Sequence, residues 1–417
     1  MIKTKTLNCG IRLVTEELPH VKSVSAGVWV RAGAVRENAR QAGISHFIEH
    51  MLFKGTAKRT AKQLAEDVDR IGGQINAFTG KEATCYYLKT LSANFAKGAE
   101  ILSDMLLASK LDRAEADKER QVIMEEIKMI EDSPEDDIHD LICEQIFRGA
   151  SLSKSVIGSP STLVNIKPAT MRAYMRRLYT SGNIVLAVAG GFDAAEVERE
   201  AERLFSALPG GLETLTPDDC AYVPRHRSKV KDIEQSHICM GVRGVALEDA
   251  RYYSLMLLNN IMGGGMSARF FQNIREQKGL AYAVYSSASS FTSDGLYSIY
   301  AAVGHDKVKE AAAAVLFELA RLKKDGITRD EFHTAKEQMK SQYIFAQENV
   351  NGRMFAIGKN YLLLNRVFTP EEILEKIDGV TWEEIHETAG LITDPARYSA
   401  AVIGRRRRNW ERLLRDG

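Results

Sequence analysis

The stretch His46-Phe47-Ile48-Glu49-His50 carries two histidines four positions apart, with a glutamate directly before the second. On an α-helix this spacing places both imidazoles on one face, about one turn apart, so that both can reach a single tetrahedral Zn²⁺. Apolar residues fill the motif and continue through 51–53, which predicts a helix over 44–54 beside a core, ended by Gly55. Polar groups beside a core need partners, which argues against the alternative of an exposed polar helix face. Glu49 is placed to act as a general base on a water molecule without binding the metal.

A catalytic zinc needs a third protein ligand and one open position. A second helix is predicted from the capping-box pair Asp112 and Glu115 to about residue 132. Two of its glutamates are seven positions apart and therefore share a face, which suits one ligand and one carboxylate that orients a ligand. Spacing alone does not choose among the candidates, and any one of them is more often a solvated or ion-paired side chain. The candidates are Glu115, Glu119, Glu125, Glu126 and Glu131, of which Glu119 and Glu126 share the face.

Composition sets the wider limits. The chain has 417 residues, 45% of them hydrophobic and 27% charged, which suggests two or more domains around substantial cores. The net charge of +1 gives no general attraction to nucleic acid. No secretory signal or membrane-spanning run is visible, and the five cysteines form no CxxC pair, which favours a reducing cytoplasm.

The order of predicted elements repeats along the chain. Residues 207–232 are rich in proline, glycine and charge, and indicate a linker. We therefore predict domains at 1–210 and 233–417 joined by a linker at 211–232, with an α+β arrangement in each. Strands are expected within 5–31 and at 74–78, 84–91, 183–189, 238–242, 282–287 and 296–303. Helices are expected at 60–72, 92–109, 136–147, 194–206, 252–261, 267–277, 308–323 and 329–347, with more helix to the end.

Five segments together resemble a known family. The metal motif extends to Met51, and the segment 119–126 ends in a glutamate 76 positions after His50 (126 − 50). The segments Gly72-Gly73-Gln74-Ile75-Asn76-Ala77-Phe78-Thr79, 81–87 and 275–282 continue the likeness. The chain resembles the pitrilysin/insulinase family of zinc metallopeptidases, the inverzincins with an H-x-x-E-H motif. Among its members it is most similar to the bacterial branch related to the β subunit of the mitochondrial processing peptidase.

The resemblance implies roles around the metal. His46, His50 and Glu126 would hold one Zn²⁺ per chain, and Glu49 would be the general base that activates the zinc-bound water. Glu119 would be a further catalytic carboxylate close to the metal.

The resemblance also implies substrate contacts. Asn76 and Ala77 would hold the substrate backbone, on a strand at 74–79 to which an extended peptide adds as a further strand. Arg275 and Tyr282 would reach the substrate and the developing oxyanion from the second half. Taken alone, Asn76 is more often a turn residue, Arg275 a surface residue and Tyr282 a core residue.

The fold that the resemblance implies is α+β, with two homologous domains. Each is a mainly antiparallel sheet with helices packed on one face, and the two face each other across a cavity. The first carries the zinc motif, and the second lacks it. The implied activity is zinc-dependent endopeptidase cleavage of extended or unfolded polypeptides. A homodimer is expected by analogy with relatives, and neither nucleic acid nor a membrane is expected as a partner.

Departures and alternatives remain open. The segment 151–158 lacks the family's usual His-Pro-Leu-Gly-like sequence, and the short run 263–265 does not match the long glycine-rich loop of the non-catalytic processing subunit. One alternative is a non-catalytic structural or partner subunit. Another is a nucleic-acid or membrane-surface module using Arg405-Arg406-Arg407-Arg408, although a solvated tail explains that run more simply.

Overall fold

Segments from both halves of the sequence combine in each of the two units into which the chain folds. The computed structural model describes residues 2–214, 218 and 221–406, so parts of the predicted linker and of the Arg405–Arg408 run lie outside the described residues. The first unit comprises Met1–Lys128, Lys154–Thr216 and Ile344–Thr369. The second comprises Met129–Ser153, Pro217–Tyr343 and Pro370–Gly417. Each half of the sequence therefore contributes one segment to the other unit, while the boundaries at 210 and 233 stay a prediction.

The first unit is built on a six-stranded sheet in the order β1-β2-β6-β3-β5-β4. All neighbouring strands are antiparallel except β2 and β6, which run parallel. Its strands are β1 (Ile2–Thr6), β2 (Arg12–Glu17), β3 (Ser23–Val30), β4 (Gln74–Thr79), β5 (Thr84–Leu91) and β6 (Ile184–Gly190). The predicted strand at 74–78 thus forms one edge of the sheet.

The helices of the first unit follow the predicted start signals. Thr60 and Gln63 form the expected capping box at the start of α2. The α-helices are α1 (Ile44–Leu52), α2 (Ala61–Arg70), α3 (Phe95–Ala108), α4 (Arg113–Asp132, which continues into the second unit), α6 (Pro160–Leu163), α7 (Pro168–Leu178), α8 (Ala194–Phe205) and α12 (Val350–Leu364). Short turns of helix are η1 (Ala34–Arg36), η2 (Ser92–Asn94) and η4 (Ser181–Asn183).

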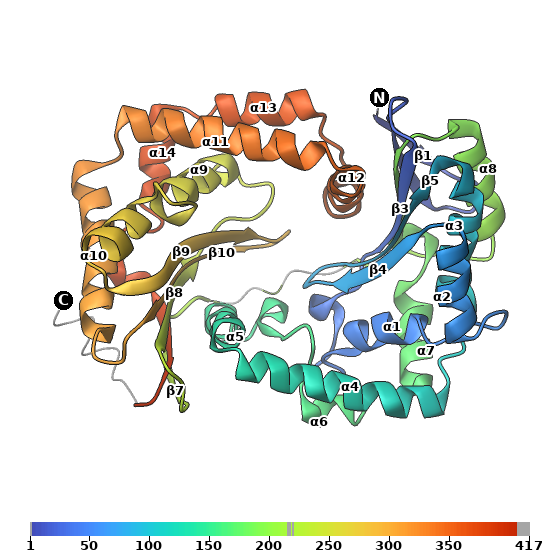
Figure 1. The fold of residues 1–417 in the computed structure, drawn as a ribbon, viewed down its shortest axis with the longest axis horizontal. Helices are drawn as coiled ribbons and strands as arrows, with labels where there is room; N and C mark the ends of the chain where they lie inside the picture. The colour runs from blue at the N-terminus through green and yellow to red at the C-terminus, as the bar shows by residue number, and fades with distance from the viewer. Residues whose placement is uncertain (1, 215–217, 219–220, 407–417) are drawn as a thin grey trace. The chain divides into compact units, whose positions relative to one another are not determined.

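Helices cover both faces of the first sheet, where one covered face was expected. Trp29 of β3 lies in a buried cluster with Met354 and Ile357 of α12. Successive strand residues point to opposite faces, so Ala26 of β3 and its cross-strand partner Leu88 face the other way, and Leu88 lies against α3. Figure 1 shows α12 on the opposite side of this sheet from α2, α3 and α8. A helix from late in the sequence therefore completes the first unit.

Close approach of α12 depends on a glycine. A Cβ atom at Gly358 would lie 2.2 Å from Nε1 of Trp29, so only a residue without a side chain allows the helix to sit there.

The second unit is built on a five-stranded sheet in the order β7-β11-β8-β10-β9. Its strands are β7 (His226–Val230), β8 (Ser236–Arg243), β9 (Ala281–Ser290), β10 (Gly295–Val303) and β11 (Ser399–Gly404). The strand β11 corrects the expectation of helix to the end of the chain. Its residues are all buried, and they pair antiparallel with β8 and parallel with β7. Pairing with strands more than 150 residues away outweighs the local helical tendency here.

The helices of the second unit also include one from the other half of the sequence. Helix α5 packs on β8 and β11, and a Cβ atom at Gly241 of β8 would lie 2.8 Å from Ile142 of α5. The α-helices are α5 (Pro134–Ile146), α9 (Tyr252–Gly263), α10 (Val308–Asp325), α11 (Arg329–Gln347), α13 (Pro370–Asp378) and α14 (Trp382–Ala389). Short turns are η3 (Ser151–Ser153) and η6 (Pro395–Arg397), and η5 (Phe271–Gln277) is a π-helix where an ordinary helix was expected.

The prediction of an α+β fold with two mainly antiparallel sheets is confirmed. Among the described residues, no helix combines the length and apolar character needed to cross a bilayer.

Candidate metal centre

Helix α1 is held at its start and along one side. Gly43 precedes it with a φ of 92°, a conformation that favours glycine. The buried carboxylate of Glu37 accepts hydrogen bonds from the backbone N–H groups of Gly43 (2.6 Å) and Ser45 (2.9 Å). A carboxylate in this position satisfies free N–H groups and interacts favourably with the helix dipole. The helix start is therefore fixed one residue away from His46.

The apolar side of α1 places the motif on the opposite side. Phe47, Ile48, Met51 and Leu52 are completely buried, whereas the histidines and Glu49 are only partly buried. The core side chains therefore set the rotation of the helix about its axis.

Helix α4 brings one glutamate to the two histidines. Oε2 of Glu126 lies 3.8 Å from Nε2 of His46 and 3.5 Å from Nε2 of His50. The neighbouring Glu125 instead forms an exposed pair with Lys128 at 2.7 Å. Burial of Ile123 and Ile127 against the core determines which glutamate faces α1.

These three side chains fit a zinc ion. Their ligand atoms lie within 4.8 Å of one another, and no other described group of three or more His, Cys, Asp or Glu side chains meets that condition. In a tetrahedral site with metal–ligand bonds of about 2.0–2.1 Å, neighbouring ligand atoms are about 3.3 Å apart. The distances from Glu126 to the histidines are only slightly longer. Two imidazoles and a carboxylate are also the ligand types of catalytic zinc sites with an open fourth position.

The protonation of His46 suits metal binding. Burial, together with the smaller effect of the neighbouring His50, lowers the pKa of His46 to about 4. The imidazole is therefore neutral near pH 7, which is the form that donates an electron pair to a metal.

Glu119 and Lys54 extend the site behind His50. Oε2 of Glu119 lies 3.0 Å from Nδ1 of His50, and its Oε1 lies 2.6 Å from Nζ of Lys54. The Glu119 side chain is only 7% exposed. Glu119 was predicted from the sequence as a site residue and Lys54 was not, although Lys54 follows His50 by four positions as His50 follows His46.

Glu49 lies beside the three candidate ligands and is held by a strand. The hydroxyl of Thr79, the last residue of β4, donates a hydrogen bond to Oε2 of Glu49. The pKa of Glu49 is raised, mainly because the carboxyl group is buried. The hydrogen bond from Thr79 and the nearby His50 lower this pKa, whereas the negative charge of Glu126 raises it. A carboxylate with a raised pKa is suited to taking and returning a proton near neutral pH. Thr79 belongs to the segment 72–79 that carries the family resemblance, but no role was predicted for it from the sequence.

The predicted substrate residues of β4 lie on alternate faces of the strand. Ala77 and Thr79 are two positions apart on the strand, so both side chains point to the face of the sheet on which Glu49 lies. The side chain of Asn76 points to the opposite face, and its Oδ1 accepts a hydrogen bond from the N–H of Ala77 (2.8 Å). Among the described residues, no strand of the sheet lies beside β4 on its edge away from β5.

Arg275 and Tyr282 lie in the second unit and contact each other. The guanidinium carbon of Arg275 lies 5.4 Å from the ring centre of Tyr282 and 4.8 Å from that of Phe271. The Tyr282 side chain is strongly exposed, which differs from the core position typical of a tyrosine. Their predicted contacts with substrate stay a prediction.

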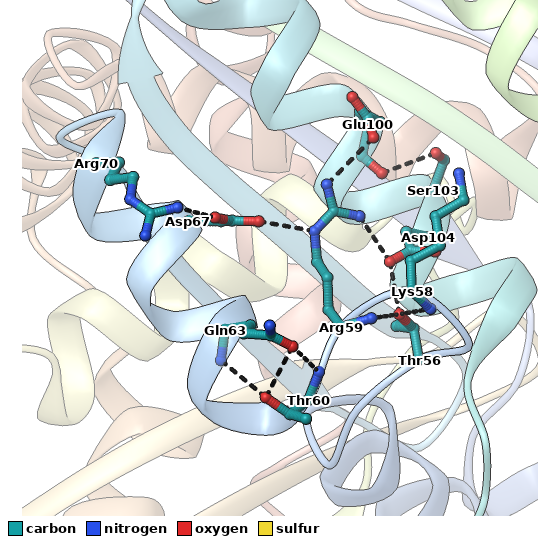
Figure 2. Close-up of polar contacts among 10 residues, drawn as sticks. All are labelled: Thr56, Lys58, Arg59, Thr60, Gln63, Asp67, Arg70, Glu100, Ser103 and Asp104. Carbon is teal, nitrogen blue, oxygen red and sulfur yellow. Dashed lines mark hydrogen bonds and ion pairs between the residues drawn. The ribbon is translucent and has the colours of Figure 1, made fainter.

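A polar cluster fixes the loop that leaves α1. Figure 2 shows Arg59 between α2 and α3, with its guanidinium donating to Asp67 (2.9 Å), Asp104 (2.7 Å) and Glu100 (3.1 Å). Thr56 donates to Asp104 at 2.7 Å and accepts the N–H of Arg59 at 2.9 Å. The segment after the metal motif is thus tied to two further helices.

Known proteins match the chain over nearly its full length. The sequence model described as insulinase (peptidase family M16) matches residues 12–160, and that of the peptidase M16 inactive domain matches residues 165–339. A protein of Bacillus subtilis (strain 168), named as an uncharacterized zinc protease, is 39% identical over 97% of this chain and 98% of its own. A protein of the same description from Rickettsia bellii is 37% identical, over 95% of this chain and 96% of its own.

Two solved structures share the fold. A structure described as a peptidase M16 inactive domain from Pseudomonas fluorescens has a TM-score of 0.91 at 17% identity, covering 98% of each chain. A protease from Helicobacter pylori has a TM-score of 0.88 at 20% identity, covering 97% of this chain and 99% of that one.

Proposed function

Because the chain belongs to the insulinase family, peptidase family M16, we propose that it is a zinc-dependent endopeptidase that hydrolyses extended or unfolded polypeptides. The observation that carries the proposal is the convergence of His46, His50 and Glu126, with Glu49 beside them. The names of the relatives, which call them zinc proteases, support the same activity.

Each side chain has a distinct task in this mechanism. His46, His50 and Glu126 would hold one zinc ion per chain. When bound, zinc lowers the pKa of a water molecule and polarises a carbonyl oxygen. Glu49 takes a proton from the attacking water and then delivers it to the nitrogen of the leaving amine, so that the peptide bond breaks without release of a strong base. Glu119 keeps His50 oriented through the hydrogen bond to Nδ1.

The substrate would bind as an additional strand at the edge of β4. That edge offers backbone N–H and C=O groups beside Thr79 and Glu49, which supports recognition of an extended backbone with little demand on sequence. Asn76 and Ala77 belong to this strand, and Arg275 and Tyr282 would contribute from the second unit to stabilising the oxyanion.

The setting that we propose is the cytoplasm, with a homodimer as the assembly. Cys85 and Cys239 are buried thiols that form no disulfide, which supports a reducing compartment. The homodimer rests on the family resemblance alone, and neither nucleic acid nor a membrane is part of the proposal.

The alternative is a non-catalytic structural or partner subunit of the same family. It would keep the fold but bind no zinc or cleave no peptide. Substitutions at two adjacent glutamates can distinguish the peptidase from the non-catalytic subunit, because Glu126 faces the histidines and Glu125 points into solvent.

The test compares the wild type with Glu126→Gln and Glu125→Gln. We expect about one zinc per chain in the wild type and in Glu125→Gln, since the site needs three protein ligands. Glu126→Gln loses a charged ligand and should carry far less zinc and no measurable peptidase activity. Metal analysis and cleavage of a quenched fluorescent peptide library measure both quantities.

Removal of zinc with a chelator should abolish cleavage in the wild type, and added Zn²⁺ should restore it. A wild-type chain that binds no zinc after metal-replete purification would refute the proposal in favour of the non-catalytic subunit. Zinc binding without cleavage of any library peptide would also count against an endopeptidase acting on extended chains.

Thr79→Val should lower kcat by about 10-fold or more, because a hydrogen bond to a charged group contributes about 1.5–3 kcal/mol. Thr79→Ser keeps the hydroxyl and should retain most of the activity. Thr90→Val is the matched control, since it removes a hydroxyl of β5 that donates to the carbonyl of Ile71 at 2.9 Å. Equal losses in Thr79→Val and Thr90→Val would contradict a specific role for Thr79.

A further inference from the structure

A buried carboxylate behind the candidate metal site is shared between a histidine and a lysine. The side chain of Glu119 is 7% exposed, with Oε2 3.0 Å from Nδ1 of His50 and Oε1 2.6 Å from Nζ of Lys54. A carboxylate removed from water in this way needs partners for both oxygens. Lys54 therefore completes the environment of Glu119.

The two histidines are held differently. Nδ1 of His50 faces Glu119, whereas Nδ1 of His46 is buried with no hydrogen-bond partner in the part of the chain that the structure describes. A histidine that donates its Nδ1–H to a carboxylate has its tautomer and ring orientation fixed, and its Nε2 is then directed at the metal. The orientation of His50 thus depends on Glu119 staying where it is.

Lys54 is well placed to hold Glu119. It follows α1 by two residues, and its backbone N–H donates to the carbonyl of Met51 at 3.1 Å, so its backbone is tied to the last turn of the metal helix. Its ammonium group then reaches Glu119 on α4. The same contact therefore links α1, which carries both histidines, to the helix that carries Glu126.

We propose that Lys54 is a positioning residue of the metal site, which fixes the Glu119 carboxylate against His50 and thereby increases the affinity of the His46–His50–Glu126 site for Zn²⁺. The inference rests on the proposed zinc-dependent function and adds to it a residue that touches neither metal nor substrate.

The direction in which zinc affinity changes when Lys54 is removed distinguishes a positioning role from an effect of its charge alone. Lys54 is a cation near a site for a dication, so its charge alone would weaken zinc binding. If charge were its whole influence, its removal would tighten zinc binding. Positioning through Glu119 predicts the opposite sign.

The experiment measures zinc affinity of the full chain by competition with a chromophoric chelator, which needs no peptidase activity. We expect Lys54→Met to bind zinc about 10–100-fold more weakly, the usual effect of losing a residue that orients a metal ligand. Lys54→Arg, which can still donate to Oε1, should recover most of the affinity. Lys128→Met is the matched control, because it removes the lysine of an exposed lysine–glutamate pair on α4, the helix that also carries Glu119.

A double substitution tests whether Lys54 acts through Glu119. In a Glu119→Gln background, Lys54→Met should cause no further loss, because effects that pass through one contact do not add. Circular dichroism and urea unfolding of each variant check that the first unit is folded.

Each outcome decides the matter. An unchanged or tighter zinc affinity in Lys54→Met, or full additivity with Glu119→Gln, would overturn the inference while leaving the proposed peptidase intact. A wild-type chain that binds no zinc would overturn both, and the two failures are thereby distinguished.

Discussion

Replacing Glu49 by glutamine should lower kcat by about 10²–10⁴-fold, the range typical of a lost general base. Glutamine is close to glutamate in size, so it can still accept the hydrogen bond from Thr79, but it cannot take a proton from water. Zinc content should stay near that of the wild type, since Glu49 is not among the three converging ligands. The measurements are kcat and KM on a fluorescent peptide and zinc per chain.

The control for this substitution is Glu66→Gln. Glu66 lies on α2 with its carboxylate 3.6 Å from Lys62 in an exposed pair, so the same chemical change should leave activity unaltered. A Glu49→Gln protein that keeps its zinc and cleaves at the wild-type rate would exclude Glu49 as the base. Loss of zinc together with activity would mean that Glu49 acts on the metal site itself.

Replacing Arg59 by methionine should destabilise the first unit by about 3 kcal/mol, because removing one partner of a buried ion pair leaves the other charge uncompensated. Asp104 is the partner most affected, since its side chain is 3% exposed and two of its hydrogen-bond donors are Arg59 and Thr56. Methionine keeps much of the apolar stem of arginine, so the loss would reflect charge and hydrogen bonding more than packing. Urea unfolding followed by circular dichroism measures the change.

A second arginine in Figure 2 supplies the comparison. Arg70 pairs with Asp67 at 2.8 Å, but its side chain is 71% exposed, so Arg70→Met should cost less than about 1 kcal/mol. Equal stability of the Arg59→Met and Arg70→Met proteins would show that the buried cluster contributes no more than a surface pair. The ordered loop after α1 would then need another explanation.

Local patterns in the sequence determined the metal helix. The four-residue spacing of His46 and His50 and the apolar residues between them were enough to predict a helix with both imidazoles on one face, and α1 has that form. The capping pair Thr60 and Gln63 likewise marked the start of α2. Such features depend on helical hydrogen bonds between residues three or four apart, so a short window of sequence contains them.

The pairing of strands that are far apart in the sequence could not be predicted from such short windows. The strand β11 was expected to be helical, and it is a strand because it pairs with β7 and β8. The exchange of α5 and α12 between the two units also left no local mark, because apolar residues at helical spacing indicate a buried helix face but do not identify the sheet that covers it.

The sequence by itself was therefore enough to identify the two histidines and the neighbouring Glu49 as candidate site residues, and to predict the single helix that carries them. Residue spacing left Glu125 and Glu126 open, and only the family resemblance favoured Glu126, whose carboxylate lies beside the histidines in the tertiary structure. That Thr79 contacts Glu49 and Lys54 contacts Glu119 was decided by the tertiary structure alone. The physical reason is that a side chain's direction within a helix follows from local periodicity, whereas its partner on another element is set by how both elements pack into the core.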